Sequence, residues 1–321
     1  MCGFTVIYSY TPDAPPVDVS ELRRINDYMK ARGPDGEGEW FSHDGRVGLG
    51  HRRLAILDPS ETGAQPMQLC QDDGGPRLVI TYNGEIYNYL DIRLELEKKG
   101  YVFRTNTDTE VLVQSYVHWG LNCIKKFNGM FSFVIWDAKK RRLIIVRDRF
   151  GIKPLYLWND ATGLAVCSEI KQLCGIPGFK GALDLEIAHQ YLCYGDFTIG
   201  PNTLWKDVIE VEPGTLLVIE ADKYRPGQDL VPVRWYEIAR REKSTVVTER
   251  DAVAEFSRLL EDAIRIRLRA DVPVAVALSG GLDSSMIASI AARQNDSGSH
   301  ISSFSSRFEG YGEDEGHYIA E

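Results

Sequence analysis

The chain has 321 residues, of which 44% are hydrophobic and 26% charged, and it carries a net charge of −9. This composition predicts a globular protein of two domains, and the acidic balance makes nucleic acid and anionic membrane surfaces poor partners. There is no secretory signal and no run of about 18 apolar residues, and the six cysteines and six histidines lack disulfide-framework or metal-ligand spacing, so we expect a reduced, cytoplasmic protein.

The chain begins Met1-Cys2-Gly3. A small second residue allows the initiator methionine to be removed, which would leave Cys2 with a thiol and a free α-amine on one Cα. The thiolate would then be a nucleophile, and the amine, with an ordinary pKa of roughly 7.7–8.0, could take its proton without a histidine. Because a cysteine near a terminus is more often a small buried hydrophobe, the rest of the chain must decide between these interpretations.

Residues 1–220 show a pattern rich in strands. Alternating or continuous apolar runs predict strands over 4–10, 47–56, 78–82, 131–136, 143–146, 164–167 and 215–220. Helices are predicted around 22–29, over 89–99 and from Asp108 to Gly120. Asn83-Gly84-Glu85 is predicted to end the strand at 78–82. This order predicts an α+β fold of antiparallel sheets with helices packed outside.

The composition changes after residue 220. Residues 221–247 are polar, with Pro and Gly, and predict a linker. Thr248 and Asp251 are predicted to cap a long amphipathic helix. A buried strand at 272–278, a helix at 286–293 and a strand at 301–308 then follow. The order strand, Gly-rich turn, helix, strand is the start of a parallel, doubly wound α/β sheet.

The Gly-rich turn between strand 272–278 and its helix suggests a phosphate site. Two glycines allow a ligand to approach the backbone, and serine hydroxyls with a helix N-terminus provide hydrogen-bond donors. Asp283 would repel phosphate unless a cation lay between them, which implies Mg²⁺. The bland alternative is an ordinary polar turn. The residues concerned are Ser279, Gly280, Gly281, Asp283 and Ser284.

Splitting an amide with a thiol also requires donors for an oxyanion and charges that hold the substrate. Asn83 and Gly84 can supply a side-chain and a backbone N–H. If the amide is that of glutamine, Arg53 can bind its α-carboxylate, and Glu85 with Asp108 can bind its α-ammonium. Taken singly, Asn-Gly is most often a turn, and each of these charges is most often a solvated surface group.

The ordered motifs together resemble the glutamine-dependent asparagine synthetases of the bacterial B type, along the whole of the chain. The matching stretches are Met1-Cys2-Gly3, Arg32-Gly33-Pro34-Asp35, His51-Arg52-Arg53-Leu54, Asn83-Gly84-Glu85-Ile86-Tyr87-Asn88, Thr107-Asp108-Thr109-Glu110, Phe127-Asn128-Gly129-Met130-Phe131, Arg147 to Tyr156, Ser168-Glu169-Ile170-Lys171 and Ser279 to Ser285.

This resemblance implies a class II glutamine amidotransferase domain at 2–220, which is an αββα sandwich of the N-terminal-nucleophile type. It also implies the start of an ATP pyrophosphatase domain at 248–321. The matching positions imply Cys2 as nucleophile, with Asn83 and Gly84 as oxyanion hole. They imply glutamine binding by Arg53, Glu85 and Asp108. ATP phosphates would contact Ser279, Gly280, Gly281, Asp283 and Ser284, with Leu278 beside the adenine and ribose and Asp283 near Mg²⁺.

The implied reaction uses ammonia from glutamine and an ATP-activated carboxylate, most often that of aspartate, to form an amide. Family members continue far beyond Glu321, so we expect the acceptor pocket to lie outside these residues. Two alternatives stay open: a related amidotransferase acting on a sugar acid or another carboxylate, and a catalytically silent scaffold. No nucleic acid or membrane partner is expected, and a homodimer is left open.

Overall fold

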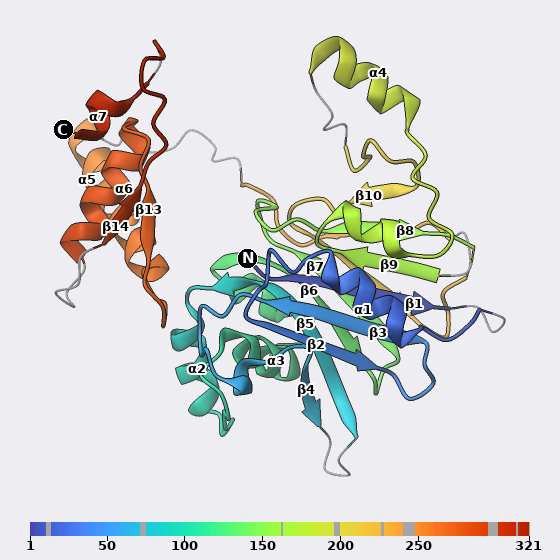
Figure 1. The fold of residues 1–321 in the computed structure, drawn as a ribbon. Helices are drawn as coiled ribbons and strands as arrows, with labels where there is room; N and C mark the ends of the chain where they lie inside the picture. The colour runs from blue at the N-terminus through green and yellow to red at the C-terminus, as the bar shows by residue number, and fades with distance from the viewer. Residues whose placement is uncertain are drawn as a thin grey trace. The chain divides into compact units, whose positions relative to one another are not determined.

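The computed structural model describes residues 1–10, 14–70, 75–161, 163–195, 200–225, 228–239, 248–294, 301–312 and 314–320. The chain divides into two compact units, Met1–Ile238 and Ala239–Glu321 (Figure 1). Residues 226–227 and 240–247 of the predicted linker lie outside the described residues.

The first unit contains two antiparallel sheets of six strands each (Figure 1). One sheet has the order β10-β8-β9-β1-β3-β2, with the bounds Val208–Glu210, Tyr156–Asn159, Gly163–Cys167, Gly3–Ser9, Val47–Arg53 and Gly36–Phe41. The other has the order β12-β11-β7-β6-β5-β4, with the bounds Val233–Arg234, Thr215–Glu220, Arg142–Arg147, Gly129–Asp137, Pro76–Ile86 and Met67–Cys70.

Helices α1, α2 and α3 of this unit pack on the outer faces of the two sheets. Ile25 of α1 and Leu173 of a 3₁₀ turn cover the first sheet, and α2 and α3 cover the second. The bounds are Val19–Asp27 for α1, Tyr89–Glu97 for α2, Asp108–Trp119 for α3 and Leu185–Tyr194 for α4; the 3₁₀ turns are Glu61–Gly63, Gly120–Lys126 and Ile170–Gly175.

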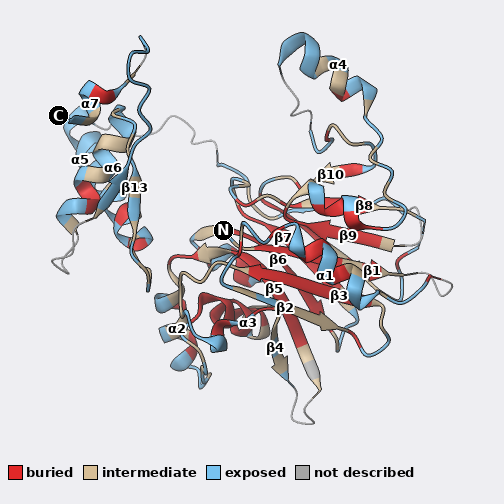
Figure 2. Ribbon diagram, viewed as in Figure 1, coloured by how far each residue is buried: buried red, intermediate tan, exposed pale blue. Residues whose placement is uncertain are grey.

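Alternation along the strands explains why the two sheets stack. Val134 of β6 and Ile145 of β7 point into the core between the sheets, whereas their neighbours Phe133 and Ile144 pack against the helical layer. Both faces of these strands are therefore buried, and Figure 2 shows them mostly in the buried colour while α4 is largely exposed. The four layers confirm the predicted αββα sandwich.

Strand β5 differs from its sequence prediction in length. Asn83, Gly84 and Glu85 were predicted to end the strand, but β5 continues to Ile86 and keeps its register with β6 as far as Gly129. Close packing explains why a Gly-containing segment stays extended here. A Cβ on Gly84 would lie 2.3 Å from the carbonyl oxygen of Met130, so only glycine lets the strands pair at this point.

Strands β2, β4, β8, β10 and β12 and helix α4 were not predicted. The sequence of β2, Gly36-Glu37-Gly38-Glu39-Trp40-Phe41, has little apolar alternation, and β2 lies at the edge of its sheet. It becomes a strand because β3 offers a partner along its full length. Strand β12 lies within the span predicted as linker and pairs with β11 of the second sheet.

The second unit has the predicted order of strand, turn, helix and strand. Helix α5, Glu249–Arg267, begins after Thr248, whose hydroxyl accepts the backbone N–H of Asp251 at 3.2 Å. Strands β13, Ala275–Ala277, and β14, Ser302–Phe304, pair in parallel. Helix α6, Leu282–Gln294, connects them in the sequence, and α7 spans Gly316–Ala320. Both strands are shorter than predicted, because among the described residues the ladder joins only three pairs.

We expect the core between the sheets to carry much of the stability of the first unit. Replacing Leu49, which is fully buried there, with Ala should lower the free energy of unfolding by about 2–5 kcal/mol. The matched change of Leu185 on α4, which is 78% exposed, should alter it by less than about 0.5 kcal/mol. All six tryptophans precede residue 239, so tryptophan fluorescence during urea unfolding measures this unit alone. Equal losses in the two variants would contradict the prediction.

Candidate active site

A cavity of about 340 Å³ opens in the first unit beside the start of β1 and the last part of β5. The structure brings to this one cavity all six residues that the sequence analysis selected for thiol chemistry and glutamine binding. They are Cys2, Arg53, Asn83, Gly84, Glu85 and Asp108.

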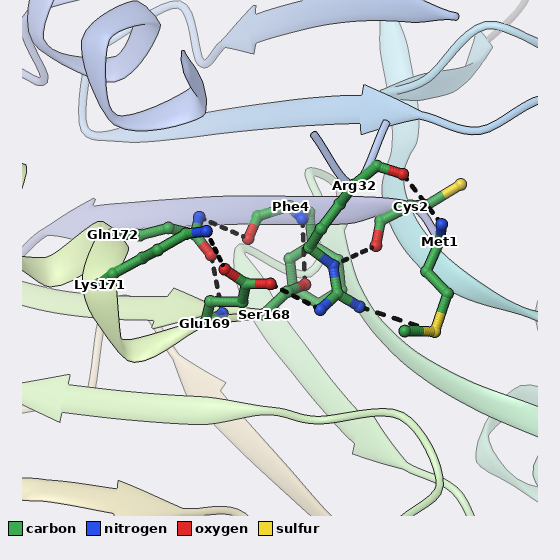
Figure 3. A network of polar contacts seen from close by, with 8 residues as sticks. All are labelled: Met1, Cys2, Phe4, Arg32, Ser168, Glu169, Lys171 and Gln172. Carbon is green, nitrogen blue, oxygen red and sulfur yellow. Dashed lines mark hydrogen bonds and ion pairs between the residues drawn. The ribbon is translucent and has the colours of Figure 1, made fainter. Parts of the chain in front are cut away.

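Cys2 is held at the cavity by contacts on both sides of its Cα. Its Sγ accepts the backbone N–H of Leu54 at 3.3 Å, and its carbonyl oxygen accepts the Nε–H of Arg32 at 3.1 Å. Arg32 also accepts the N-terminal ammonium of Met1 at 2.9 Å through its own carbonyl and pairs with Glu169 at 2.7 Å (Figure 3). The start of the chain is therefore fixed rather than frayed.

The next residues of β1 are tied to the loop and 3₁₀ turn after β9. The N–H of Phe4 donates to Ser168 Oγ at 3.1 Å, and the Phe4 carbonyl accepts Gln172 Nε2 at 3.1 Å (Figure 3). All three residues are fully buried. These bonds fix the strand that begins directly after Cys2.

Burial shifts the pKa values of the Cys2 thiol and of the N-terminal amine in opposite directions. Burial raises the pKa of the Cys2 thiol, while the Leu54 N–H, the N-terminal ammonium and Lys153 act to lower it. Burial lowers the pKa of the N-terminal ammonium, and nearby Arg32 and Lys153 lower it further. This amine belongs to Met1. An amine with a lowered pKa near a thiol that needs a base to ionise suits nucleophilic chemistry.

The side chain of Asn83 is 1% exposed, and neither amide atom has a hydrogen-bond partner among the described residues. An unsatisfied buried polar group costs about 1–3 kcal/mol. Because Asn83 lines the cavity, a carbonyl or oxyanion bound there could satisfy its NH₂ group. The orphaned amide is thus a feature that a ligand would complete.

Two carboxyl groups, those of Glu85 and Asp108, also line the cavity. Asp108, the first residue of α3, accepts the Tyr82 hydroxyl at 2.7 Å and the Ile86 N–H at 2.9 Å, yet burial raises its pKa to about 6. Burial and the neighbouring Asp108 raise the pKa of Glu85. A cation bound in the cavity would favour the ionised forms of both.

Arg53 reaches the cavity while holding the loop that follows β3. Its Nη1 donates to the carbonyl of Ser60 at 2.8 Å, and its Nη2 donates to the carbonyls of Leu57, at 3.1 Å, and Asp58. The guanidinium therefore shapes the wall of the cavity as well as presenting a positive charge to it.

The residues selected for phosphate binding lie in the second unit, between β13 and α6. The backbone turns at Gly280, whose φ is +83°, and the hydroxyls of Ser279 and Ser284 lie 3.0 Å apart. Leu278 precedes the turn and donates its N–H to Phe304 at 2.9 Å. Asp283 and Gly281 are exposed at the start of α6. The polar groups of the turn bond mainly to one another.

Two further results concern function. Within the described residues, no three His, Cys, Asp or Glu side chains lie close enough together to hold a metal ion. No helix there is long and apolar enough to cross a membrane.

Sequence reasoning passed over three residues of the cavity. Tyr82 was taken only as part of a strand, and its hydroxyl binds Asp108. Gln65 and Lys153 also line the cavity. Lys153 belongs to a stretch that the resemblance quoted without a role, so that stretch was the available signal.

The family models place this architecture among known proteins. Residues 1–229 match the glutamine amidotransferase domain, and residues 255–321 match asparagine synthase. Asparagine synthetase [glutamine-hydrolyzing] 1 of Bacillus subtilis is 38% identical over 314 residues, which is 97% of this chain and 46% of that protein.

Two other relatives widen the comparison. Putative asparagine synthetase [glutamine-hydrolyzing] 2 of Methanocaldococcus jannaschii is 35% identical over 97% of this chain and 60% of its own length. Amidase chry2 of Gibberella zeae is 38% identical over 90% of this chain and 42% of its own. The chain thus spans about half the length of the curated relatives it matches.

Solved structures agree on the fold. Glutamine phosphoribosylpyrophosphate amidotransferase from B. subtilis, complexed with ADP and GMP, aligns with a TM-score of 0.53 at 18% identity, over 94% of this chain and 65% of that one. The resemblance seen in the sequence is confirmed by the family match over residues 1–229. The chain belongs to the glutamine amidotransferase domain family.

Proposed function

We propose that the chain carries the glutamine-hydrolysing site of an ATP-dependent, amide-forming ligase. The observation that carries the proposal is one cavity that unites the Cys2 thiol, the orphaned amide of Asn83 and the carboxyl pair Glu85 and Asp108. Asparagine synthetase is the leading identity of the whole enzyme: aspartate, glutamine and ATP give asparagine, glutamate, AMP and pyrophosphate. The curated relatives named as synthetases support it.

The proposed chemistry starts once Met1 has been removed. The α-amine of Cys2 takes the thiol proton, and Sγ attacks the side-chain amide carbon of glutamine, forming a tetrahedral oxyanion. Asn83 Nδ2 and the Gly84 N–H stabilise that oxygen. The C–N bond breaks, the α-ammonium protonates the leaving group, and ammonia departs. Water then cleaves the thioester to glutamate and restores the thiol.

Substrate selection follows from charge. Glutamine carries an α-carboxylate and an α-ammonium, and the cavity presents Arg53 as a cation and Glu85 with Asp108 as carboxyl groups. We assign the α-carboxylate to Arg53 and the α-ammonium to the two carboxyl groups. Binding a cation would offset the desolvation that raises the pKa of both.

We assign ATP to the turn between β13 and α6. Ser279, Gly280, Gly281 and Ser284 would contact phosphate oxygens, and Leu278 would lie beside the adenine and ribose. Asp283 contributes a single exposed carboxylate, which fits Mg²⁺ that arrives with the nucleotide, because such ions use one or two carboxylates plus phosphates. Bound there, Mg²⁺ would neutralise phosphate charge.

The proposal also covers the acceptor of the amide nitrogen, the domain bounds, the location and the assembly of the protein. Aspartate is the leading acceptor, and amidation of another carboxylate is the alternative, favoured by the relative named as an amidase. We also assign the glutaminase domain to residues 2–220, a linker to 221–247 and the synthase-like part to 248–321, with a cytoplasmic location and a homodimer as one assembly.

Replacing Cys2 with Ala should abolish glutamine hydrolysis by the 321-residue protein, because the nucleophile is lost. Glutamate release from glutamine is the measurement. Replacing Cys174, which is exposed, should leave it unchanged. An uncleaved N-terminal tag should also abolish hydrolysis, since the α-amine becomes an amide. Normal turnover by the tagged protein would rule out the amine as base.

Replacing Asn83 with Ala should lower kcat for glutamine hydrolysis by about 10²–10³-fold with a smaller change in KM, because the oxyanion exists only in the transition state. Replacing Arg53 with Ala should act mainly by raising KM. Steady-state kinetics at several glutamine concentrations separates the two effects. The opposite pattern would mean that the roles are exchanged.

Glutamine binding should weaken as the pH falls through about 6, because Asp108 then gains a proton and no longer attracts an ammonium group. Calorimetric titration of the Cys2→Ala variant between pH 5 and 8 measures binding without turnover. In the Cys2→Ala, Asp108→Asn double variant, affinity should be low and nearly independent of pH. A pH dependence that survives Asp108→Asn would assign the titration to another group.

A further inference from the structure

Lys153 lines the same cavity as Cys2, although the proposed reaction has not used it. The residue is 5% exposed. Lysine is almost never buried to this extent unless its charge is paired. Burying an ammonium is costly, so this position calls for a physical reason.

The ammonium of Lys153 has no hydrogen-bond or ion-pair partner in the part of the chain that the structure describes. Two arginines near the cavity have fixed partners: Arg32 pairs with Glu169 at 2.7 Å, and Arg53 donates to loop carbonyls. Lys153 therefore presents its positive charge to the cavity without a fixed partner.

The backbone of Lys153 is held firmly. Its N–H donates to Asp148 Oδ2 at 3.0 Å, and its carbonyl accepts Arg147 Nε at 2.9 Å. Both Asp148 and Arg147 are buried, and Asp148 also accepts the N–H groups of Phe131 at 3.1 Å and Ile152 at 3.1 Å. These hydrogen bonds to two buried charged side chains fix the position of the Lys153 backbone beside the cavity.

Five charged groups act on the Cys2 end of the cavity. Lys153 and Arg32 are positive, Asp35 and Asp108 are negative, and the N-terminal amine can be either charged or neutral. Burial lowers the pKa of Lys153, and Glu85 is the carboxyl group that acts most strongly to raise it. An amine that accepts the thiol proton must be neutral beforehand, and Arg32 is paired with Glu169. Once the amine has taken the proton it is a cation as well. Arg53 is assigned to the substrate carboxylate, so among the described residues Lys153 is the second cation that lines the cavity and can face the negatively charged sulfur.

We propose that Lys153 is a positioning residue whose buried ammonium stabilises the Cys2 thiolate in the cavity. The inference rests on the proposed function, in which that thiolate attacks glutamine. The proton leaves Sγ for the neutral α-amine, and Lys153 keeps all its protons and forms no covalent bond. Its contribution is electrostatic and acts through Cys2, in a site where burial otherwise favours the neutral thiol.

The test measures how readily the thiol ionises, in the absence of glutamine. The 321-residue protein, with removal of Met1 verified by mass, is treated with iodoacetamide from pH 5 to 10. Mass spectrometry of the N-terminal peptide follows alkylation of Cys2 separately from the other five cysteines. The variants are Lys153→Met, Lys153→Gln and Lys153→Arg, with Lys99→Met, an exposed lysine, as control.

Both neutral variants should alkylate about tenfold more slowly at pH 7, with profiles displaced toward alkaline pH, because one pKa unit corresponds to a factor of ten. Lys153→Arg should stay within about threefold of the unmodified protein, and Lys99→Met should be unchanged. Profiles of both neutral variants that coincide with that of the unmodified protein, at an unaltered melting temperature, would overturn the proposal. Two neutral side chains are used so that a packing defect in one does not decide the result.

Glutamine hydrolysis is measured in parallel, and the two results are separable. A protein that hydrolyses no glutamine but shows the displaced profiles contradicts the proposed function and supports the role of Lys153. If the protein hydrolyses glutamine but the alkylation profile of Cys2 is the same with and without the Lys153 charge, the proposed function is supported and the role of Lys153 is contradicted.

Discussion

The structure depends above all on fixing the second residue of the chain. A terminus ordinarily frays, because it is covalently attached on one side only. Here β1 lies between β3 and β9, so it is paired along both edges. The end of the first helical segment closes over it: a Cβ on Gly3 would lie 2.4 Å from Met29 Sδ, and Arg32 bonds the carbonyl of Cys2. The sandwich thus holds the start of the chain in place through both neighbouring strands and through Arg32.

Three polar or charged side chains that line the cavity are buried at a cost in free energy. Asn83 buries an amide without partners, Asp108 holds a carboxyl whose pKa burial raises to about 6, and Lys153 presents a nearly buried ammonium. Each feature costs folding stability when the cavity holds no ligand. In the proposed function, glutamine supplies a carbonyl for Asn83 and an ammonium for Asp108, and the Cys2 thiolate is the anion that Lys153 faces. Local rules are commonly broken at functional sites for this reason.

The sequence was sufficient for the sandwich because alternation in β6 and β7 is strong, with Val134 and Ile145 on one face and Phe133 and Ile144 on the other. It was insufficient for β2, whose Gly and Glu residues have little tendency to form strands and depend on β3 for pairing.

Within the site, too, the sequence identified some charged residues, whereas the contacts of others depend on the tertiary structure. Motifs pointed to Asp108 and Arg53, but the carbonyls that Arg53 binds became visible only in the folded loop. Lys153 was missed because nothing in its local sequence reports burial; the cage of Asp148 and Arg147 that buries it is a tertiary feature.

The location of these residues also says what the glutamine chemistry requires of the rest of the chain. Every group assigned to it, from Cys2 to Lys153, lies within the first unit, and the contacts that hold these groups come from the same unit. The turn assigned to ATP lies in the second unit, with its own hydrogen bonds. The two proposed chemistries are therefore assigned to residues of separate units, and no assigned residue is shared between them.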